Sequence, residues 1–102
     1  MEYVCSELNN GEIINVSHKE YPLFYATLYG DKILCAKFSK RLSCAVKHLP
    51  IRVEFNFEYN TQKALDMGVS KDPSLVVNGE IFLEGLKEAE GITEKFQKLL
   101  KS

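Results

Sequence analysis

The feature that most constrains this fold is one long helical pattern between two strand-like segments. Apolar residues recur at three- and four-residue steps over residues 31–50, which is typical of an amphipathic helix. Asp31 is a good N-cap, and Pro50 ends the run. The repeating positions are Leu34, Phe38, Leu42, Ala45 or Val46, and Leu49.

The flanking segments predict two neighbouring parallel strands. Residues 23–29 are almost wholly apolar and aromatic, which favours a central strand covered on both faces. Residues 51–59 alternate strictly between apolar and polar, so that strand has one wet face. A strand, a long helix and a second strand normally make a right-handed parallel crossover. We expect a core that includes Phe24, Tyr25, Phe55 and Phe57.

The second half of the chain predicts a short helix, a hairpin and a last helix. Asn60 or Thr61 caps a brief helix that ends near Gly68. Asn78-Gly79 lies between two β-rich runs and is the dipeptide that best suits a type I′ hairpin turn. The last helix has one apolar stripe made of Ile92, Phe96, Leu99 and Leu100.

The first twenty residues are the least determined. They predict either a hairpin around Asn9-Asn10-Gly11 or a strand with a loose tail. We favour a strand at residues 13–16, pairing with the edge that residues 51–59 would otherwise leave open. The chain is therefore expected to be one domain, 1–102, with an N-terminal extension at 1–20 and a core at 21–102.

Composition excludes several classes of protein. The chain has 102 residues, of which 45% are hydrophobic and 26% charged, with a formal net charge of −1. These values suit an ordinary globular domain and give no reason to expect nucleic acid as a partner. The apolar runs are too short for a membrane span. Because Glu2 and Glu7 interrupt the place where a signal peptide would lie, we expect a cytoplasmic protein.

The three cysteines, Cys5, Cys35 and Cys44, are an odd number without a Cys-x-x-Cys motif, so free thiols are predicted. Within one helix, Cys35 and Cys44 would lie roughly 13 Å apart, whereas a disulfide needs Cα atoms about 4.4–6.8 Å apart. Cys5 and Cys44 are expected to be structural. His18 and His48 are expected to be solvated or capping, and no metal or cofactor is predicted.

From residue 23 onward the predicted order is β-α-β-α-β-β-α, and the segment GVSKDPSLVVNGEIFLEG, residues 68–85, adds a specific pattern. The chain resembles small archaeal and bacterial thioredoxin- and glutaredoxin-like proteins. The resemblance implies an α/β thioredoxin-like fold, with a central mixed sheet flanked by helices. It also implies a cis-proline at Pro73, followed by a hairpin ending at Gly85.

The resemblance departs where that family keeps its chemistry. The family has Cys-x-x-Cys at the start of the helix after the first strand, and the matching residues here are Lys32-Ile33-Leu34-Cys35. An alternative register begins the motif at Cys35 and ends it at Phe38. Cys35 is the candidate catalytic residue, and its alternative is a buried core position. The candidate groove comprises Lys32, Lys71, Asp72 and Pro73.

Two functions follow from the resemblance. In the first, Cys35 forms transient mixed disulfides with a protein or small thiol partner held at the Pro73 groove. In the second, the domain is a redox-inactive binding module that keeps the groove and has lost the nucleophile. A two-thiol oxidoreductase is not expected, because no second cysteine lies nearby. The sequence does not specify an oligomeric state.

Overall fold

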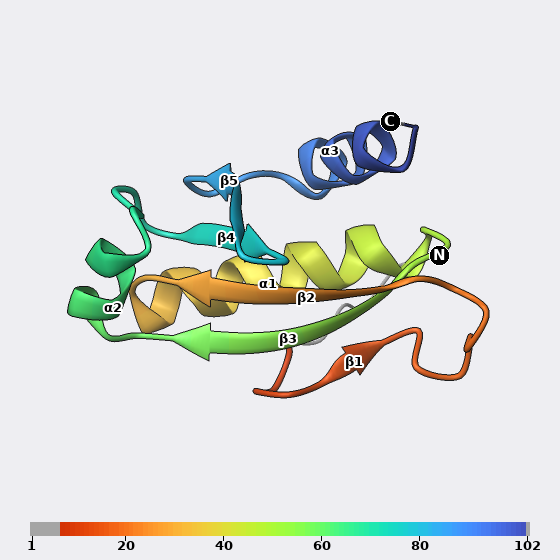
Figure 1. Ribbon diagram of the computed structural model, residues 1–102, viewed down its shortest axis with the longest axis horizontal. Helices are drawn as coiled ribbons and strands as arrows, with labels where there is room; N and C mark the ends of the chain where they lie inside the picture. The colour runs from red at the N-terminus through yellow and green to blue at the C-terminus, as the bar shows by residue number, and fades with distance from the viewer. Residues whose placement is uncertain (1–6, 102) are drawn as a thin grey trace.

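The computed structural model describes residues 7–101, which form a five-stranded mixed sheet and three helices (Figure 1). The order of strands across the sheet is β1-β3-β2-β4-β5. Within residues 7–101, no helix is both long and apolar enough to cross a membrane. The elements are β1 (Ile13–Ile14), β2 (Leu23–Tyr29), α1 (Lys32–Lys47), β3 (Arg52–Glu58), α2 (Thr61–Asp66), β4 (Ser74–Val77), β5 (Glu80–Glu84) and α3 (Ala89–Lys101).

The predicted crossover is confirmed. Asp31 caps α1, and its side chain accepts hydrogen bonds from the backbone N–H groups of Ile33 and Leu34. The helix connects β2 to β3, which pair in parallel along their whole length. β2 lies in the middle of the sheet, with β3 on one side and the antiparallel β4 on the other. The carboxyl ends of β2 and β3 therefore meet at one edge, next to the start of α1.

The hairpin of β4 and β5 turns at Asn78-Gly79, as predicted. Both residues have positive φ angles, +49° and +84°, which a type I′ turn requires. Asn78 also fixes the hairpin to the centre of the sheet. Its side-chain oxygen accepts a hydrogen bond from the backbone N–H of Tyr25 at 2.9 Å, and its own N–H donates to the carbonyl of Tyr25 at 2.8 Å.

The core lies between the sheet and the helices α1 and α3, which pack on the same side of it (Figure 1). α3 is anchored there by Phe96. The centroid of its ring lies 4.7 Å from the ring centroid of Phe82 and 6.4 Å from that of Phe24. Leu99 and Leu100 of the predicted stripe remain 37% and 38% exposed. The largest fully buried side chains of this core include Phe38, Phe55, Phe96, Leu28, Leu42, Ile51, Leu75 and Ile92.

The opposite face of the sheet is less covered than the sequence predicted. Residues 23–29 were expected to be covered on both faces, yet the side chain of Tyr25 is 55% exposed. The reason is the size of α2, which has six residues, none of them buried. It lies beyond the carboxyl ends of β2 and β3 instead of across them (Figure 1). The placement of Tyr25 in the core is therefore wrong, whereas Phe55 is fully buried.

The N-terminal segment closes the edge of β3. β1 pairs with it, as predicted; the pairing is antiparallel, and the strand covers Ile13 and Ile14 instead of residues 13–16. Next to it, the side-chain oxygen of Asn10 accepts a hydrogen bond from the backbone N–H of Phe57 at 2.8 Å. Leu8 is buried, and its N–H donates to the hydroxyl of Ser39 in α1. This part of the extension is therefore tied to both the sheet and the helix.

Asn15 holds the end of α1 and the start of β3 together. Its side-chain amide donates to the carbonyl oxygens of Val46, Leu49 and Ile51, at 3.1, 3.3 and 2.9 Å. Its φ of +61° is a left-handed conformation that asparagine tolerates better than most residues. One side chain thus adds a donor to three carbonyls at the end of α1 and in the turn that leads into β3.

We expect Asn15→Gly to lower the free energy of unfolding by about 1–2 kcal/mol, because the carbonyls at a partly buried helix end lose their donor. Glycine keeps the positive φ accessible, so the loss reports the hydrogen bonds. Asn15→Ala should cost more, because alanine adds backbone strain. Urea denaturation measures both, with the exposed Asn9→Gly as the control. Equal stability of wild type and Asn15→Gly would contradict this role.

Candidate functional site

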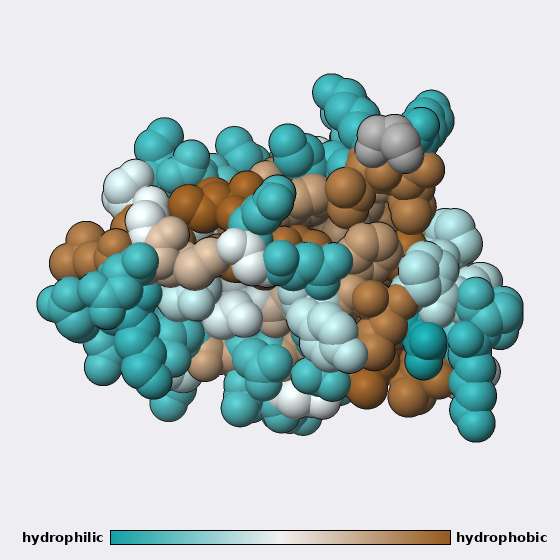
Figure 2. Space-filling view, viewed as in Figure 1, coloured by the Kyte–Doolittle hydropathy of each residue, from teal (hydrophilic) through white to brown (hydrophobic). Residues whose placement is uncertain are grey.

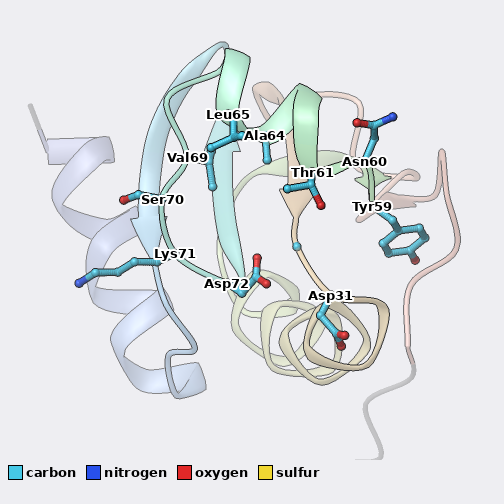
Figure 3. Close-up of a pocket in the computed structure, with 11 residues that line it drawn as sticks. Asp31, Tyr59, Asn60, Thr61, Ala64, Leu65, Val69, Ser70, Lys71 and Asp72 are labelled. Atoms are coloured by element: carbon cyan, nitrogen blue, oxygen red, sulfur yellow. The ribbon is translucent and has the colours of Figure 1, made fainter.

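A cavity of about 360 Å³ opens where β2 and β3 end and α1 begins. Its walls come from the start of α1, from α2 and from the loop that leads into β4 (Figure 3). These segments are far apart in the sequence, and the parallel crossover brings them to the same edge. The lining residues are Gly30, Asp31, Tyr59, Asn60, Thr61, Ala64, Leu65, Val69, Ser70, Lys71 and Asp72.

Gly30 allows the start of α1 to approach the loop before β4. A Cβ atom at this position would lie 2.7 Å from the carboxyl oxygen Oδ1 of Asp72 and 3.2 Å from the Cα of Pro73. The φ angle of Gly30 is +139°, which side-chain-bearing residues rarely adopt. Its N–H donates to the carbonyl of Glu58, so this turn also connects β2 to β3. Any larger residue would force the two walls of the cavity apart.

The loop with Pro73 is held from both sides. The Asp72–Pro73 peptide bond is cis, and the proline ring is fully buried. The carbonyl of Pro73 accepts a hydrogen bond from the N–H of Gly85 at 2.8 Å. The hydroxyl of Ser74 donates to the carbonyl of Lys71 at 2.7 Å. These contacts fix the backbone on which Asp72 is carried.

The cavity is acidic. The carboxyl group of Asp72 lies in the middle of the ring of lining residues, whereas the side chain of Lys71 points away from it (Figure 3). Asp31 contributes a second carboxylate at the helix start. Tyr59 forms one rim and is 47% exposed. Partial burial raises the pKa of its hydroxyl, with smaller effects from Cys35 and Glu7. The site thus combines two carboxylates with an aromatic ring.

Cys35 lies in the first turn of α1, and its side chain is fully buried. Burial raises the pKa of its thiol from 9.0 to about 11, and the charges of Asp72 and Asp31 act in the same direction. A helix N-terminus beside a lysine would instead lower a thiol pKa. Here desolvation and the two carboxylates outweigh those effects. The core alternative therefore describes Cys35 better than the reactive alternative.

Lys32 is not brought to the Pro73 loop. It is exposed on α1 and lines a different, more open hollow together with Glu7, Ile33 and Lys37. Of the four predicted groove residues, Lys71 and Asp72 line the cavity, and Pro73 is buried behind it. The helix begins at Lys32, so Cys35 is its fourth residue, as in the register that matches Lys32-Ile33-Leu34-Cys35 to the motif.

The prediction of free thiols is wrong for Cys44, which is disulfide-bonded. The spacing argument had tested only its pairing with Cys35, and Cys35 is indeed free. An odd number of cysteines still allows one pair, which tertiary structure alone decides. Cys5 lies outside the described residues. Among residues 7–101, no group of three or more side chains of His, Cys, Asp or Glu could hold a metal ion.

Of the residues that line the cavity, sequence reasoning identified only Lys71 and Asp72, and it missed Asp31 and Tyr59 among others. Asp31 was recognised only as a helix cap, and Tyr59 only as the last apolar position of an alternating strand. Both lie at the carboxyl ends of the parallel strands, and this is the edge where ligands bind in open α/β sheets. Their position directly after the two strands was the signal that could have identified them.

Comparison with known proteins supports the fold. No family model matches the chain, and a search of the curated proteins finds no match. Among solved structures, the chain is similar to the thioredoxin from Aeropyrum pernix, with a TM-score of 0.55 and 18% sequence identity. The similarity covers 97% of this chain and 96% of that one. The protein therefore has a thioredoxin-like fold.

We expect Cys35 to react slowly with iodoacetamide at neutral pH and faster as the pH rises towards 11, because only the thiolate is nucleophilic. Mass spectrometry of the alkylated chain over a pH series measures the rate at each pH. The same chain in urea is the control, since unfolding removes the burial that raises the thiol pKa. Rapid alkylation of the folded protein at pH 7 would contradict a buried, protonated thiol.

Replacing Lys32 by cysteine should permit an internal disulfide with Cys35. The two positions are one helical turn apart, within the Cα separation that a disulfide needs. Mild oxidation should remove two hydrogens from Lys32→Cys and leave Lys32→Ser unchanged, as read from intact mass. A Lys32→Cys variant that keeps two free thiols after oxidation would show that Cys35 is too deeply buried to pair.

Proposed function

We propose that this protein is a redox-inactive binding module, which uses the cavity beside Pro73 to hold an extended segment of another protein. The observation that carries the proposal is the state of Cys35. Its thiol is fully buried and has a pKa of about 11, so almost none of it is thiolate at neutral pH. The exposed position at the start of the helix holds Lys32, which cannot form a mixed disulfide.

The cavity is suited to a chain in extended conformation. It is open on one side, and it lies along a loop whose backbone is fixed by Gly85 and Ser74. A preformed wall of this kind lowers the entropic cost of binding. The carboxylate of Asp72 favours a positively charged side chain, the capping carboxylate of Asp31 adds negative charge nearby, and the ring of Tyr59 adds a surface at the rim on which a cation can lie. We therefore propose a partner segment that carries lysine or arginine.

The competing function is a monothiol redox cycle through Cys35. It requires the Cys35 sulfur to reach a partner disulfide or thiol as a thiolate. Burial and the charges of Asp72 and Asp31 oppose both requirements. The two functions share the groove and differ in their need for the cysteine. A substitution of Cys35 therefore separates them.

Selection from a library of displayed peptides against the purified protein tests the proposal. We expect enrichment of extended peptides with a basic residue. Cys35→Ala should leave their affinity unchanged, because the thiol takes no part. Asp72→Asn should weaken binding about tenfold, since it removes the carboxylate that lies in the middle of the lining residues.

The matched control is Asp66→Asn, an exposed carboxylate at the end of α2 that does not line the cavity. It should leave binding unchanged. Loss of binding in Cys35→Ala, or recovery of peptides only through a disulfide, would overturn the binding module in favour of thiol chemistry. If Asp72→Asn binds the peptides as tightly as the wild type does, the binding site lies elsewhere.

A further inference from the structure

One face of the parallel strand pair β2–β3 has no covering layer among the described residues. α1 and α3 pack on the other side, and the short α2 lies beyond the strand ends (Figure 1). Purely parallel sheets are almost always buried on both faces, whereas antiparallel sheets can face solvent on one side, and this sheet is mixed. The side chain of Tyr25, near the centre of the uncovered face, is 55% exposed.

The parallel register fixes which residues share this face. Each row of the face joins one residue of β2 to its partner in β3. Figure 2 shows this side of the molecule, where pale and hydrophilic atoms cover the middle and apolar atoms lie towards both ends and above it. We call it the open face; its rows are Leu23 with Arg52, Tyr25 with Glu54, Thr27 with Asn56, and Tyr29 with Glu58.

The open face carries one arginine, Arg52, and two glutamates, Glu54 and Glu58, so a second copy can place the arginine opposite a glutamate. Consider a second copy stacked on it, related by a two-fold axis that crosses the strands between the Tyr25 and Thr27 rows. The first row then lies over the fourth, and the second over the third. Arg52 faces Glu58 of the second copy, and Glu54 faces Asn56. On β2, Tyr25 of one copy faces Thr27 of the other. No two like charges lie directly opposite each other across the axis.

We propose that this protein self-associates through its open face, forming a two-fold dimer in which Arg52 of each copy pairs with Glu58 of the other. Both residues already have contacts within the chain, which the pair across the axis would share or replace. Arg52 uses only its Nε to donate to the carbonyl of Tyr21, at 3.0 Å. The side chain of Glu58 is 27% exposed; its Oε2 accepts a hydrogen bond from the N–H of Asn60 at 3.2 Å, and its Oε1 lies 3.4 Å from Nζ of Lys63.

An isologous contact of this type suits two stacked sheets. Sheets pack face to face with their strands within about 30° of one another. Seven residues at about 3.3 Å each, over two strands about 4.8 Å apart, give a footprint of roughly 23 by 10 Å. That area is small for a protein interface, so the dimer should be weak and depend on concentration.

The sheet edges are poorer candidates for self-association. β5 forms one edge, and pairing it antiparallel with its own copy about Phe82 would oppose Glu80 to Glu84. Like charges directly opposite each other destabilise a strand pair. The pairing of β4 with β5 also shifts register, and such a bulge disfavours further pairing. At the other edge, β1 is only two residues long.

Sedimentation velocity over a concentration series up to about 1 mM, a range suited to interfaces of this size, tests the proposal. The wild type should shift from monomer to dimer. Arg52→Glu and Glu58→Arg should each weaken association at least about tenfold, because each places like charges across the axis. An equimolar mixture of the two variants should associate as the wild type does, since opposite charges then face each other.

Circular dichroism of each variant shows that it is folded, and Lys40→Glu on the exposed surface of α1 is the matched control. Tyr25→Asp supplies an independent variant, which should abolish the dimer without touching either charge. A wild type that stays monomeric throughout would overturn the proposal. So would a dimer that the single variants leave intact, or a mixture that fails to recover. None of these residues lines the cavity, so peptide binding is tested separately.

Discussion

The parallel pairing of β2 with β3 is the constraint on which the rest of this structure depends. Because α1 must return the chain to the same end of the sheet, both strands finish at one edge, and the helix starts there. Gly30 completes the arrangement by letting the helix start touch the loop of Pro73. Without the parallel register, the residues of the cavity would be spread over opposite ends of the sheet.

The same geometry determines the chemistry of Cys35. A cysteine in the first helical turn is often activated, because the helix dipole favours the thiolate. Here the side chain faces the core, and the two nearest carboxylates further disfavour a negative charge. The fold alone does not decide function, since function depends on the groups at the site. In this chain, the local environment opposes thiol chemistry and leaves an acidic cavity in place.

The length of α2 has an effect well beyond its own six residues. A longer helix would cover the sheet and bury Tyr25, as the apolar composition of β2 predicts. The short helix instead ends at the cavity, where Ala64 and Leu65 form part of the wall. One face of β2 is consequently left as exposed as the polar face of β3 is. The apolar and aromatic composition of β2 thus predicts more burial than the strand has in one chain. Self-association would bury the uncovered face.

The sequence by itself determined the order of the elements and most of their limits. The Asp31 cap, the Asn78-Gly79 turn and the alternation in β3 are local signals, each set by the backbone preferences of a few adjacent residues. The resemblance to thioredoxin-like proteins, and not a local signal, pointed to Pro73 and to the register of Cys35 in its helix. Neither the local signals nor the resemblance could show that Lys32 lies outside the cavity, that Tyr59 lines it, that Cys44 is disulfide-bonded or that Tyr25 is exposed. Those facts depend on which distant segments pack together, and burial and charge at a given residue are properties of that packing.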